Sequence, residues 1–399
     1  MSLRSGTSFW LATGSAPMRT EPLEGDARCD VAVLGGGITG ALVAYRLVAE
    51  GVDTVLIDKR ELGTGSTAAS TGLLQYEIDT PLVDLVEMVG ERRAVHAYRR
   101  GLEAIDEIEQ LVAELGDPCG FRRRESLYFA SHFWHAGRLR REAECRQRHG
   151  FDVELLDADE LRKISSIRAR AALRSTGDGE IDPYRFTQKL LLAARSRGLR
   201  CWGQTEVVEI DEAAGGVCLS TADGRISARR IVYATGYDSR RYLASDRGTL
   251  HCTYALASEP LGTTTGWPEG MLIWETARPY FYARQTADGR AIVGGADSAF
   301  ASDHERDGKV ERRAEQVVRR FRRLFPDIPF QPAYAWAGTF GESPDGLPYI
   351  GQPSGRPNAY FAIGYGGNGI TFSTIASRLV SDLLLSRPTS DADVFGFDR

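Results

Sequence analysis

The sequence predicts an α/β protein in which a parallel-sheet unit near the N-terminus is combined with an inserted β-rich region. An apolar run at residues 30–34, three glycines, a helical stretch at 38–50 and a second apolar run at 54–57 form a strand–turn–helix–strand unit. Strand-like runs dominate residues 251–296. A strand at 360–363, a glycine-rich turn and a helix at 370–385 repeat the first pattern. We therefore expect one domain assembled from separate pieces of chain, with a β-rich domain inserted between them.

Local signals predict the remaining elements. Apolar side chains recur at helical spacing between residues 92 and 115, which predicts an amphipathic helix. Asp182 and Pro183 are typical of a helix start, and Gly198 indicates its end at about residue 197. Further elements are predicted as strands at 205–210, 216–221, 226–235, 280–283 and 290–293, and as a helix at 311–325.

Composition excludes several classes of function. The 399 residues are enough for two domains, and a net charge of −5 argues against a nucleic-acid partner. No apolar run approaches the roughly 18 residues of a membrane span, so no integral membrane segment is expected. The six cysteines form no Cys-x-x-Cys pair, which favours reduced thiols and a cytoplasmic location. The six histidines form no metal-binding pattern, so no metal site is predicted.

Residues 35–40 read Gly-Gly-Gly-Ile-Thr-Gly and match the G-x-G-x-x-G dinucleotide fingerprint directly after a strand. Gly35 permits the tight turn, Gly37 lets the backbone approach a pyrophosphate, and Gly40 lets the helix pack on the strand. The phosphates would lie at the positive end of this helix. Asp58, at the end of the second strand, would accept hydrogen bonds from ribose hydroxyls. These features predict a Rossmann-like domain, and by themselves they also fit an NAD-dependent dehydrogenase.

Three further segments favour FAD over NAD. Residues 63–74 are rich in small and hydroxyl side chains, which suit a backbone that wraps a phosphate and then follows a flat ring. Residues 231–236 form an apolar strand that ends in Ala-Thr-Gly. Residues 364–371 form a glycine-rich opening to the last helix, whose N-terminus would stabilise an anionic reduced flavin. An NAD-binding dehydrogenase would leave this last helix opening unexplained.

With these motifs the chain, from about residue 30 to 385, resembles the D-amino-acid-oxidase type of FAD-dependent oxidoreductase, which includes sarcosine oxidase and glycine oxidase. The shared phrases are G-E-I-D-P-Y-R-F at 179–186, W-A-G…D-G-L-P-Y-I-G at 336–351, and a T-x-V-x-x-I strand that begins at Thr205. We expect a discontinuous Rossmann-like FAD-binding domain and an inserted antiparallel-sheet substrate domain. The FAD-binding domain is expected to comprise residues 28–85, 146–245 and 336–390, and the substrate domain residues 86–145 and 246–335.

The resemblance implies an extended FAD, with adenosine near Asp58, pyrophosphate near residues 35–39 and isoalloxazine between residues 71–74 and 366–371. Substrate would enter on the ring face that the β-rich domain covers. The predicted cofactor-binding residues are Gly35, Gly37, Ile38, Thr39, Asp58, Lys59, Ser66, Thr67, Ser70, Thr71, Gly72, Leu73, Leu74, Val207, Thr235, Gly236, Gly366, Gly367, Asn368, Gly369, Ile370 and Thr371.

The chain departs from the family pattern at positions that bear on substrate, acceptor and flavin attachment. Glycine-oxidase-like members place an Arg after W-A-G-L to bind the substrate carboxylate, whereas here Phe340 follows W-A-G-T. Another arginine could substitute, or the substrate could lack a carboxylate. Sarcosine-oxidase-like members use a Lys for the reaction with oxygen, but residues 289–295 contain none. Ala69 replaces the His of covalent relatives and the last cysteine is Cys252, so non-covalent FAD is expected.

Candidate catalytic residues lie on the predicted strand at 280–283 and just after it. Tyr280, Tyr282 and Arg284 would share one face of an extended strand and could form a polar-tipped aromatic pocket with an anion clamp. Arg278 is an alternative clamp. The tyrosines fit packing on a sheet face equally well, with Arg284 at the surface, because aromatic residues favour strands.

The implied reaction is hydride transfer from the carbon beside a neutral amine to flavin N5, followed by hydrolysis of the imine. The substrate would be a small amine or amino acid, and the acceptor oxygen or an electron carrier. Two alternatives stay open: a flavin dehydrogenase that passes electrons to a carrier, and a flavin-binding subunit without turnover of its own.

Overall fold

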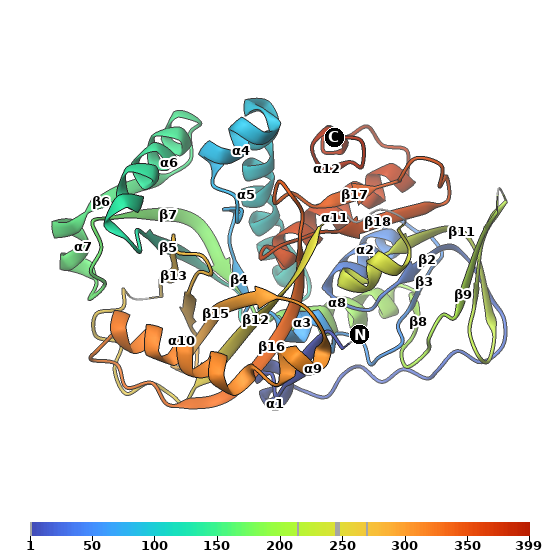
Figure 1. The fold of residues 1–399 in the computed structure, drawn as a ribbon. Coiled ribbons are helices and arrows are strands. Elements are labelled where there is room, and N and C mark those ends of the chain that lie inside the picture. Colours follow the sequence, from blue (N-terminus) through green and yellow to red (C-terminus); the bar gives the residue numbers. More distant parts are fainter. Residues whose placement is uncertain (1, 214, 244–247, 269) are drawn as a thin grey trace.

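The computed structural model describes residues 2–213, 215–243, 248–268 and 270–399, and its strands form two sheets that lie side by side (Figure 1). Eight described strands form the first sheet, in which the parallel strands occupy the centre. In spatial order they are β17 (Tyr349–Gly351), β18 (Ala359–Ile363), β11 (Arg225–Tyr233), β2 (Ala27–Leu34), β3 (Thr54–Ile57) and β8 (Arg200–Trp202). In addition, β10 (Gly216–Ser220) pairs with β11, and β9 (Glu209–Ala213) pairs with β10.

The second sheet contains ten of the described strands and is mostly antiparallel. In spatial order they are β1 (Arg4–Gly6), β16 (Pro332–Glu342), β12 (Thr249–Ser258), β15 (Ala291–Ala299), β14 (Tyr282–Gln285), β13 (Leu272–Glu275), β5 (Arg122–Phe129), β7 (Ala171–Glu180) and β4 (Leu73–Leu74), with β6 (Val153–Asp157) beside β7. Together the two sheets confirm the expected α/β class, with a parallel core joined to a largely antiparallel sheet.

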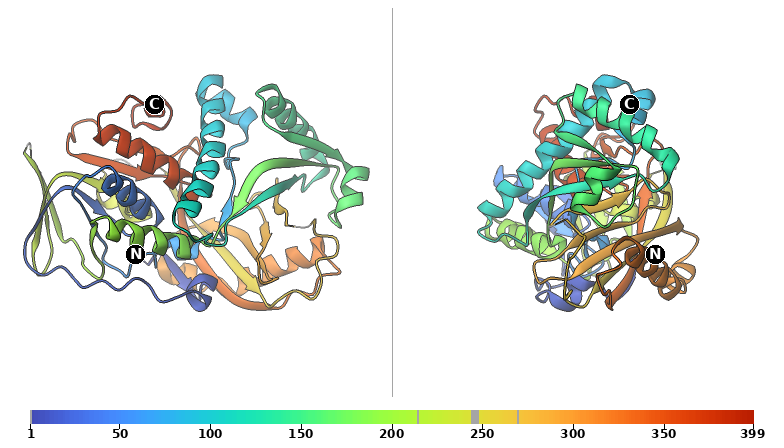
Figure 2. Two further views of the ribbon diagram at one scale, coloured as in Figure 1. Left: turned by 180° about the vertical axis from the view of Figure 1, so that it is seen from behind. Right: turned by 90° about the vertical axis from the view of Figure 1, so that its left-hand side faces the viewer.

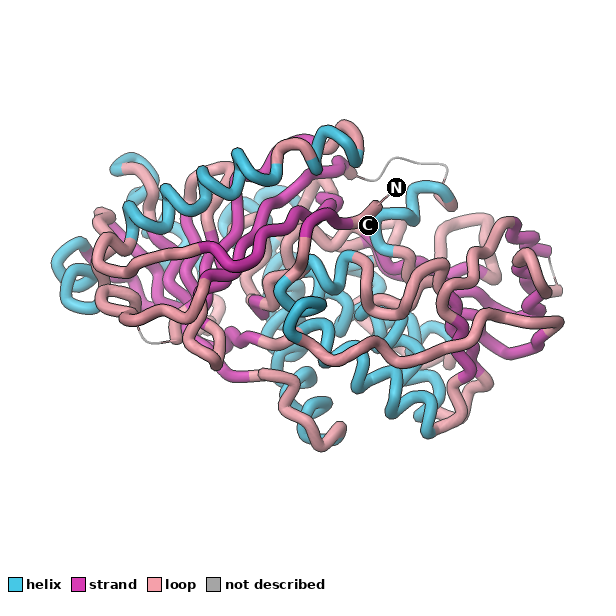
Figure 3. The backbone as a smooth tube through the Cα atoms, turned by 90° about the horizontal axis from the view of Figure 1, so that it is seen from below, coloured by secondary structure: helices cyan, strands magenta, loops and turns pink. Residues whose placement is uncertain are grey.

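The helices lie between and around the sheets, and Figure 2 shows their arrangement from two further sides. Figure 3, seen from below, shows strands gathered toward both ends of the molecule with a group of helices between them. The helices are α1 (Phe9–Thr13), α2 (Ile38–Ala49), α3 (Ser66–Ala69), α4 (Leu82–Val89), α5 (Glu91–Glu114), α6 (Ala136–Arg148), α7 (Ala158–Ile164), α8 (Pro183–Ser196), α9 (Asp303–Asp307), α10 (Val310–Leu324), α11 (Gly369–Leu384) and α12 (Ala392–Phe395), with 3-10 turns at Phe133–His135 and Gly236–Arg241. Within the described ranges, no helix combines the length and apolar character needed to cross a bilayer.

Strand alternation divides the first sheet between two cores. Val33 and Leu56 lie in the core that holds α2, α8, α5 and α11, whereas Leu34, Ile57 and Tyr233 lie in the core on the opposite face. The ten-stranded sheet has a separate core, in which the apolar side of α10 packs on β12, β15 and β16. Each sheet therefore buries its own apolar surface, and the polar cavity described below lies where the two sheets meet.

The register of the parallel strands sets the position of the site. Leu34 pairs with Ile57 and with Tyr233, and Tyr233 pairs with Phe361. The carboxyl ends of these four strands therefore meet at one edge, where ligands of open α/β sheets bind.

Several predicted elements lie where the sequence places them, including α2, α5, α8, α10 and α11. The strand predicted at 205–210 is displaced to Glu209–Ala213, because the Thr205 N–H donates to the Asp58 carbonyl instead of a ladder partner. The predicted division into domains stays a prediction, and its boundary at 245/246 lies outside the described residues. Strands β6 and β7 belong to the ten-stranded sheet, so a division by sheets would group residues 153–180 with the antiparallel part.

Candidate functional site

A long cavity opens at the carboxyl edge of the parallel strands and continues to the face of the ten-stranded sheet. It holds about 1910 Å³ of space, including the solvent at its mouth. Its lining comes from the end of β2, the residues after β3 and the turn after β11 at one end, and from β12, β14, β15 and β16 at the other. A single ligand could therefore reach from the glycine turn to the second sheet.

The glycine turn allows a backbone approach that other residues would block. Gly35 has φ +114°, and a Cβ there would lie 2.4 Å from the Ala234 carbonyl oxygen. A Cβ at Gly40 would lie 1.8 Å from the carbonyl oxygen of Gly35, so α2 can pack on the turn only through glycine. The N–H groups of Gly37 and Thr39 have no acceptor among the described residues and lie at the positive end of α2. This arrangement fits a pyrophosphate.

Asp58 follows β3 and lines the cavity beside this turn. Its Oδ2 accepts a hydrogen bond from the Gly36 N–H at 2.7 Å, and its Oδ1 accepts one from the Arg60 N–H at 2.8 Å. Burial raises the pKa of Asp58, and these two backbone bonds oppose the increase. The carboxylate is thus held in one orientation with lone pairs left for ribose hydroxyls. Lys59 is bound to Asp238 at 2.9 Å, which places this cation beside the same end of the cavity.

Three long side chains hold backbone carbonyls at the end of α3 and directly after it. Trp336 Nε1 donates to the Ala69 carbonyl at 2.8 Å, and Trp10 Nε1 donates to the Ser70 carbonyl at 2.6 Å. Arg284 Nε donates to the Thr71 carbonyl at 2.9 Å. In the same segment the Ser66 hydroxyl is enclosed without a partner among the described residues, although it lines the cavity. An enclosed hydroxyl in that position fits a phosphate oxygen as its missing partner.

The opposite wall is the start of α11. Asn368 Nδ2 donates to the carbonyls of Gln75 and Glu77, at 3.1 and 2.7 Å, and the Gly367 N–H donates to Asp79 Oδ2 at 2.8 Å. The N–H groups of Gly369 and Ile370 have no acceptor within the described parts of the chain. The helix therefore presents free donors to the cavity, and these would favour negative charge on a bound ring.

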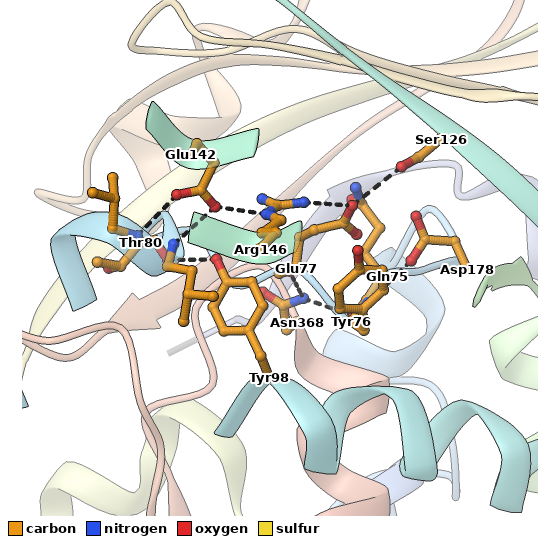
Figure 4. A network of polar contacts seen from close by, with 12 residues as sticks. Gln75, Tyr76, Glu77, Thr80, Tyr98, Ser126, Glu142, Arg146, Asp178 and Asn368 are labelled. Atoms are coloured by element: carbon orange, nitrogen blue, oxygen red, sulfur yellow. Dashed lines mark hydrogen bonds and ion pairs between the residues drawn. The ribbon is translucent and has the colours of Figure 1, made fainter. Parts of the chain in front are cut away.

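A buried network of charges supports this wall from behind (Figure 4). Arg146, which is fully buried, contacts Glu77 Oε1 at 3.0 Å and Glu142 Oε1 at 2.6 Å. Glu142 also accepts the N–H groups of residues 82 and 83 at the start of α4. Asp178 accepts the Tyr76 N–H at 3.1 Å, and burial together with the charge of Glu77 raises the pKa of Asp178 well above its usual range. The segment 75–83 is thus fixed between α6 and the start of α11.

At the second sheet the cavity is aromatic and acidic. Tyr280 OH donates to Asp79 Oδ1 at 3.0 Å, and Tyr282 OH lies 3.3 Å from Thr253 Oγ1. The two rings lie 5.7 Å apart and are inclined at 52°. A Cβ at Gly294 would lie 2.3 Å from the Tyr282 ring, so the ring can occupy this position only because residue 294 has no side chain.

Asp297 reaches the cavity because β15 is irregular at this point. Cys252 pairs with Ser298 and Tyr254 with Gly295, so two residues of β15 oppose Thr253, and Ala296 has φ +56°. Such a bulge re-aims the following side chain. Asp297 lines the cavity, and its Oδ1 is enclosed without a hydrogen-bond donor among the described residues. Burial raises the pKa of Asp297 to about 7, a bond from Thr253 opposes the shift and the charge of Asp79 adds to it.

The predicted arginine clamps do not line the cavity. Arg284 is buried, contacts Glu180 Oε2 at 3.0 Å and holds the Thr71 carbonyl, so it anchors the loop. Arg278 donates to the Asp79 carbonyl at 2.7 Å and lies over the Tyr280 ring at 4.7 Å. Phe340, which follows the Trp-Ala-Gly-Thr sequence, does line the cavity.

Most of the predicted site residues are brought together. Tyr280, Tyr282 and nearly all of the predicted cofactor-binding residues line the cavity; Gly72, Leu74, Thr371 and Arg284 are the predicted residues that do not. Sequence reasoning missed Asp79 and Asp297. The consecutive glycines before Asp297 were the available signal, because glycine pairs within a strand often mark a bulge.

Comparisons with known proteins agree with this geometry. The family model described as DAO, FAD dependent oxidoreductase, matches residues 30–383. The chain is 27% identical over 390 residues to gamma-glutamylputrescine oxidoreductase of Escherichia coli, covering 95% of this chain and 88% of the relative. It is 27% identical to glycine oxidase of Bacillus licheniformis, covering 90% and 94%. Glycine oxidase from Geobacillus kaustophilus has the same fold, with a TM-score of 0.76, 22% identity and coverage of 94% and 99%. The chain belongs to the DAO family of FAD-dependent oxidoreductases.

Proposed function

We propose that this protein oxidises the C–N bond of a small amine or amino acid. The observation that carries the proposal is the continuity of the cavity, which joins a dinucleotide-binding end to a tyrosine- and carboxylate-lined end. Relatives named for gamma-glutamylputrescine and for glycine support a nitrogen-bearing substrate.

The residues present fit an extended FAD. The N–H groups of Gly37 and Thr39, together with the enclosed Ser66 hydroxyl, would hold the pyrophosphate. Asp58 would hold the adenosine ribose, and Val207, which lines the same end, would contact the adenine. Residues 71–73 and 366–370 would hold the ring between them. When bound, FAD would supply the two-electron oxidation of the C–N bond as a hydride acceptor, and the imine product would hydrolyse in water.

The side chains of this protein would orient the substrate and exclude water. The Tyr280 and Tyr282 rings form an apolar wall with hydroxyls at its tip, which would hold the reacting carbon against the flavin side of the cavity. Arg284 would act through the Thr71 carbonyl as a positioning residue for the loop that borders the ring. Non-covalent attachment of the cofactor and the identity of the electron acceptor stay predictions.

Anaerobic titration of the purified yellow protein tests the proposal. Amines and amino acids are added without oxygen, and loss of the oxidised flavin absorption is followed. Bleaching by at least one of these compounds, but not by 2-hydroxy acids or glycerol phosphate, is expected. Bleaching by a hydroxy compound alone would overturn the proposal. Readmission of air, compared with addition of a quinone dye, then distinguishes an oxidase from a dehydrogenase.

A further inference from the structure

The distribution of charge along the cavity is uneven. Of the described residues that line it, the cationic ones are Lys59, Arg60 and Arg241. Lys59 and Arg60 directly follow Asp58, and Arg241 also lines a neighbouring hollow with Val207, so all three belong to the dinucleotide end. The end beside the second sheet thus receives no cationic side chain from the described lining.

The carboxylates at that end are not neutralised equally. Glu77 is paired with Arg146, and Asp79 accepts both the Tyr280 hydroxyl and the Gly367 N–H. Asp297 has an enclosed oxygen that receives no donor from the described chain, and an enclosed carboxylate oxygen without a donor is costly. Asp297 therefore lacks a partner that a ligand could supply.

The arginines nearest to this end are occupied elsewhere. Arg284 forms an ion pair with Glu180 and bonds to the Thr71 carbonyl, while Arg278 bonds to the Asp79 carbonyl and stacks on Tyr280. Neither guanidinium lines the cavity. A substrate carboxylate at this end would meet carboxylates and no cation of the described lining, which is repulsive in a poorly solvated site.

Aromatic faces complete the environment. Tyr280, Tyr282, Trp274 and Phe340 all line the cavity, and aromatic rings attract cations through their electron-rich faces. A carboxylate among aromatic rings suits an ammonium, amidinium or guanidinium group.

We propose that the substrate end selects a cationic amine without a carboxylate beside the reacting carbon, and that Asp297 accepts the hydrogen bond from its charged nitrogen. Where that nitrogen is the one beside the reacting carbon, it passes its proton to Asp297 before hydride transfer, so that the hydride leaves the carbon of a neutral amine. The catalytic part of this inference rests on the proposed function, whereas the choice of charge can be measured by binding alone. Asp297 is a specificity residue in this scheme, because it contacts the substrate and leaves electron transfer to the cofactor.

Two probes of the same shape and opposite charge test the charge preference: benzamidinium and benzoate. Each is titrated into the FAD-loaded protein at pH 8, where Asp297 is ionised, and binding is followed by calorimetry and by the change in flavin absorption. Benzamidinium is expected to bind at least about tenfold more tightly than benzoate, the range of a charge-assisted hydrogen bond. Asp297→Asn should remove this preference, while Asp288→Asn, in the β14–β15 turn of the same sheet, should keep it. Equal or tighter binding of benzoate, no binding of benzamidinium, or an unchanged preference in Asp297→Asn overturns the inference.

A catalytic pair separates this inference from the proposed function. Benzylamine and phenylglycine differ by the carboxylate, and anaerobic bleaching is expected with benzylamine. Bleaching by phenylglycine alone would overturn the inference and leave the proposed function intact. A strong preference for benzamidinium without bleaching by any amine or amino acid would support the charge preference and contradict the proposed function.

Discussion

Replacing Asp297 by Asn should stabilise the protein, and by more at pH 8 than at pH 5. The pKa of this carboxyl rises from its ordinary value of 3.8 to about 7 in the folded state. Between these values the unfolded chain has lost the proton while the folded protein keeps it, so stability falls as the pH rises through this window. Above pH 7 the free energy of unfolding is lower by about 4 kcal/mol, because a shift of one pKa unit is worth about 1.4 kcal/mol. Asn carries no charge, so residue 297 no longer lowers the stability of the variant as the pH rises.

The pH dependence is the diagnostic quantity, because any change in packing caused by the amide is the same at both pH values. The shift predicts that the difference in stability between variant and parent widens by about 2–3 kcal/mol from pH 5 to pH 8. At about 2.1 cal/mol/K per residue, a chain of 399 residues loses about 0.8 kcal/mol per degree, so the gap in melting temperature should widen by about 3 °C.

Thermal unfolding of the FAD-loaded proteins, at constant ionic strength and scan rate, measures this gap. The groups that act on Asp297 are Asp79, Glu342, Arg278 and Thr253, and all of them are kept in the variant. Asp288→Asn is the matched control, because that carboxylate is exposed and bonded to Arg290. The difference in stability between this variant and the parent should not increase in favour of the variant as the pH rises. An equal gap for Asp297→Asn at pH 5 and pH 8 would refute the argument that the cavity leaves this carboxylate uncompensated.

Three further predictions concern the cofactor end, the tyrosine wall and the buried network. Gly40→Ala should yield colourless protein, since its Cβ would lie 1.8 Å from a backbone oxygen, whereas Gly137→Ala, with open space at its Cβ, should purify yellow. Gly294→Ala should displace the Tyr282 ring without loss of FAD. Stopped-flow measurements should then show anaerobic flavin reduction slowed at least about tenfold. Arg146→Met leaves two buried carboxylates without their cation and should cost about 3–5 kcal/mol in thermal unfolding, whereas Arg162→Met at an exposed pair should cost less than about 1 kcal/mol.

The sequence predicts the cofactor end well because its constraints are local. A turn with positive φ and a close helix approach demand glycine at Gly35 and Gly40, and the acid after the next strand is set by the length of one βαβ unit. The family, the α/β class and the dependence on FAD are confirmed by the family match and by the fold of related structures. The individual contacts of the cofactor stay predictions.

The substrate end could not be predicted in the same way, because its groups come from strands far apart in the chain. Regular alternation placed Tyr280, Tyr282 and Arg284 on one face, but β14 begins only at Tyr282, and Arg284 is drawn into an ion pair with Glu180. That ion pair depends on the pairing of β5 and β7. The sequence pattern of residues 280–284 alone cannot predict this pairing.

Asp297 shows most clearly why chemistry at this end depends on tertiary structure. In a regular strand the side chains alternate between the two faces of the sheet, so the faces of its neighbours would predict the face of residue 297. The extra residue opposite Thr253 changes that face. The bulge aims a carboxylate into the cavity with one oxygen, Oδ1, that receives no donor from the described residues, and the expected cost in stability is one that a protein retains where function needs the group. Phe340 and Asp297 line the same cavity, and the described lining at this end contains no cationic side chain, so the charge of this end favours a cation over an anion.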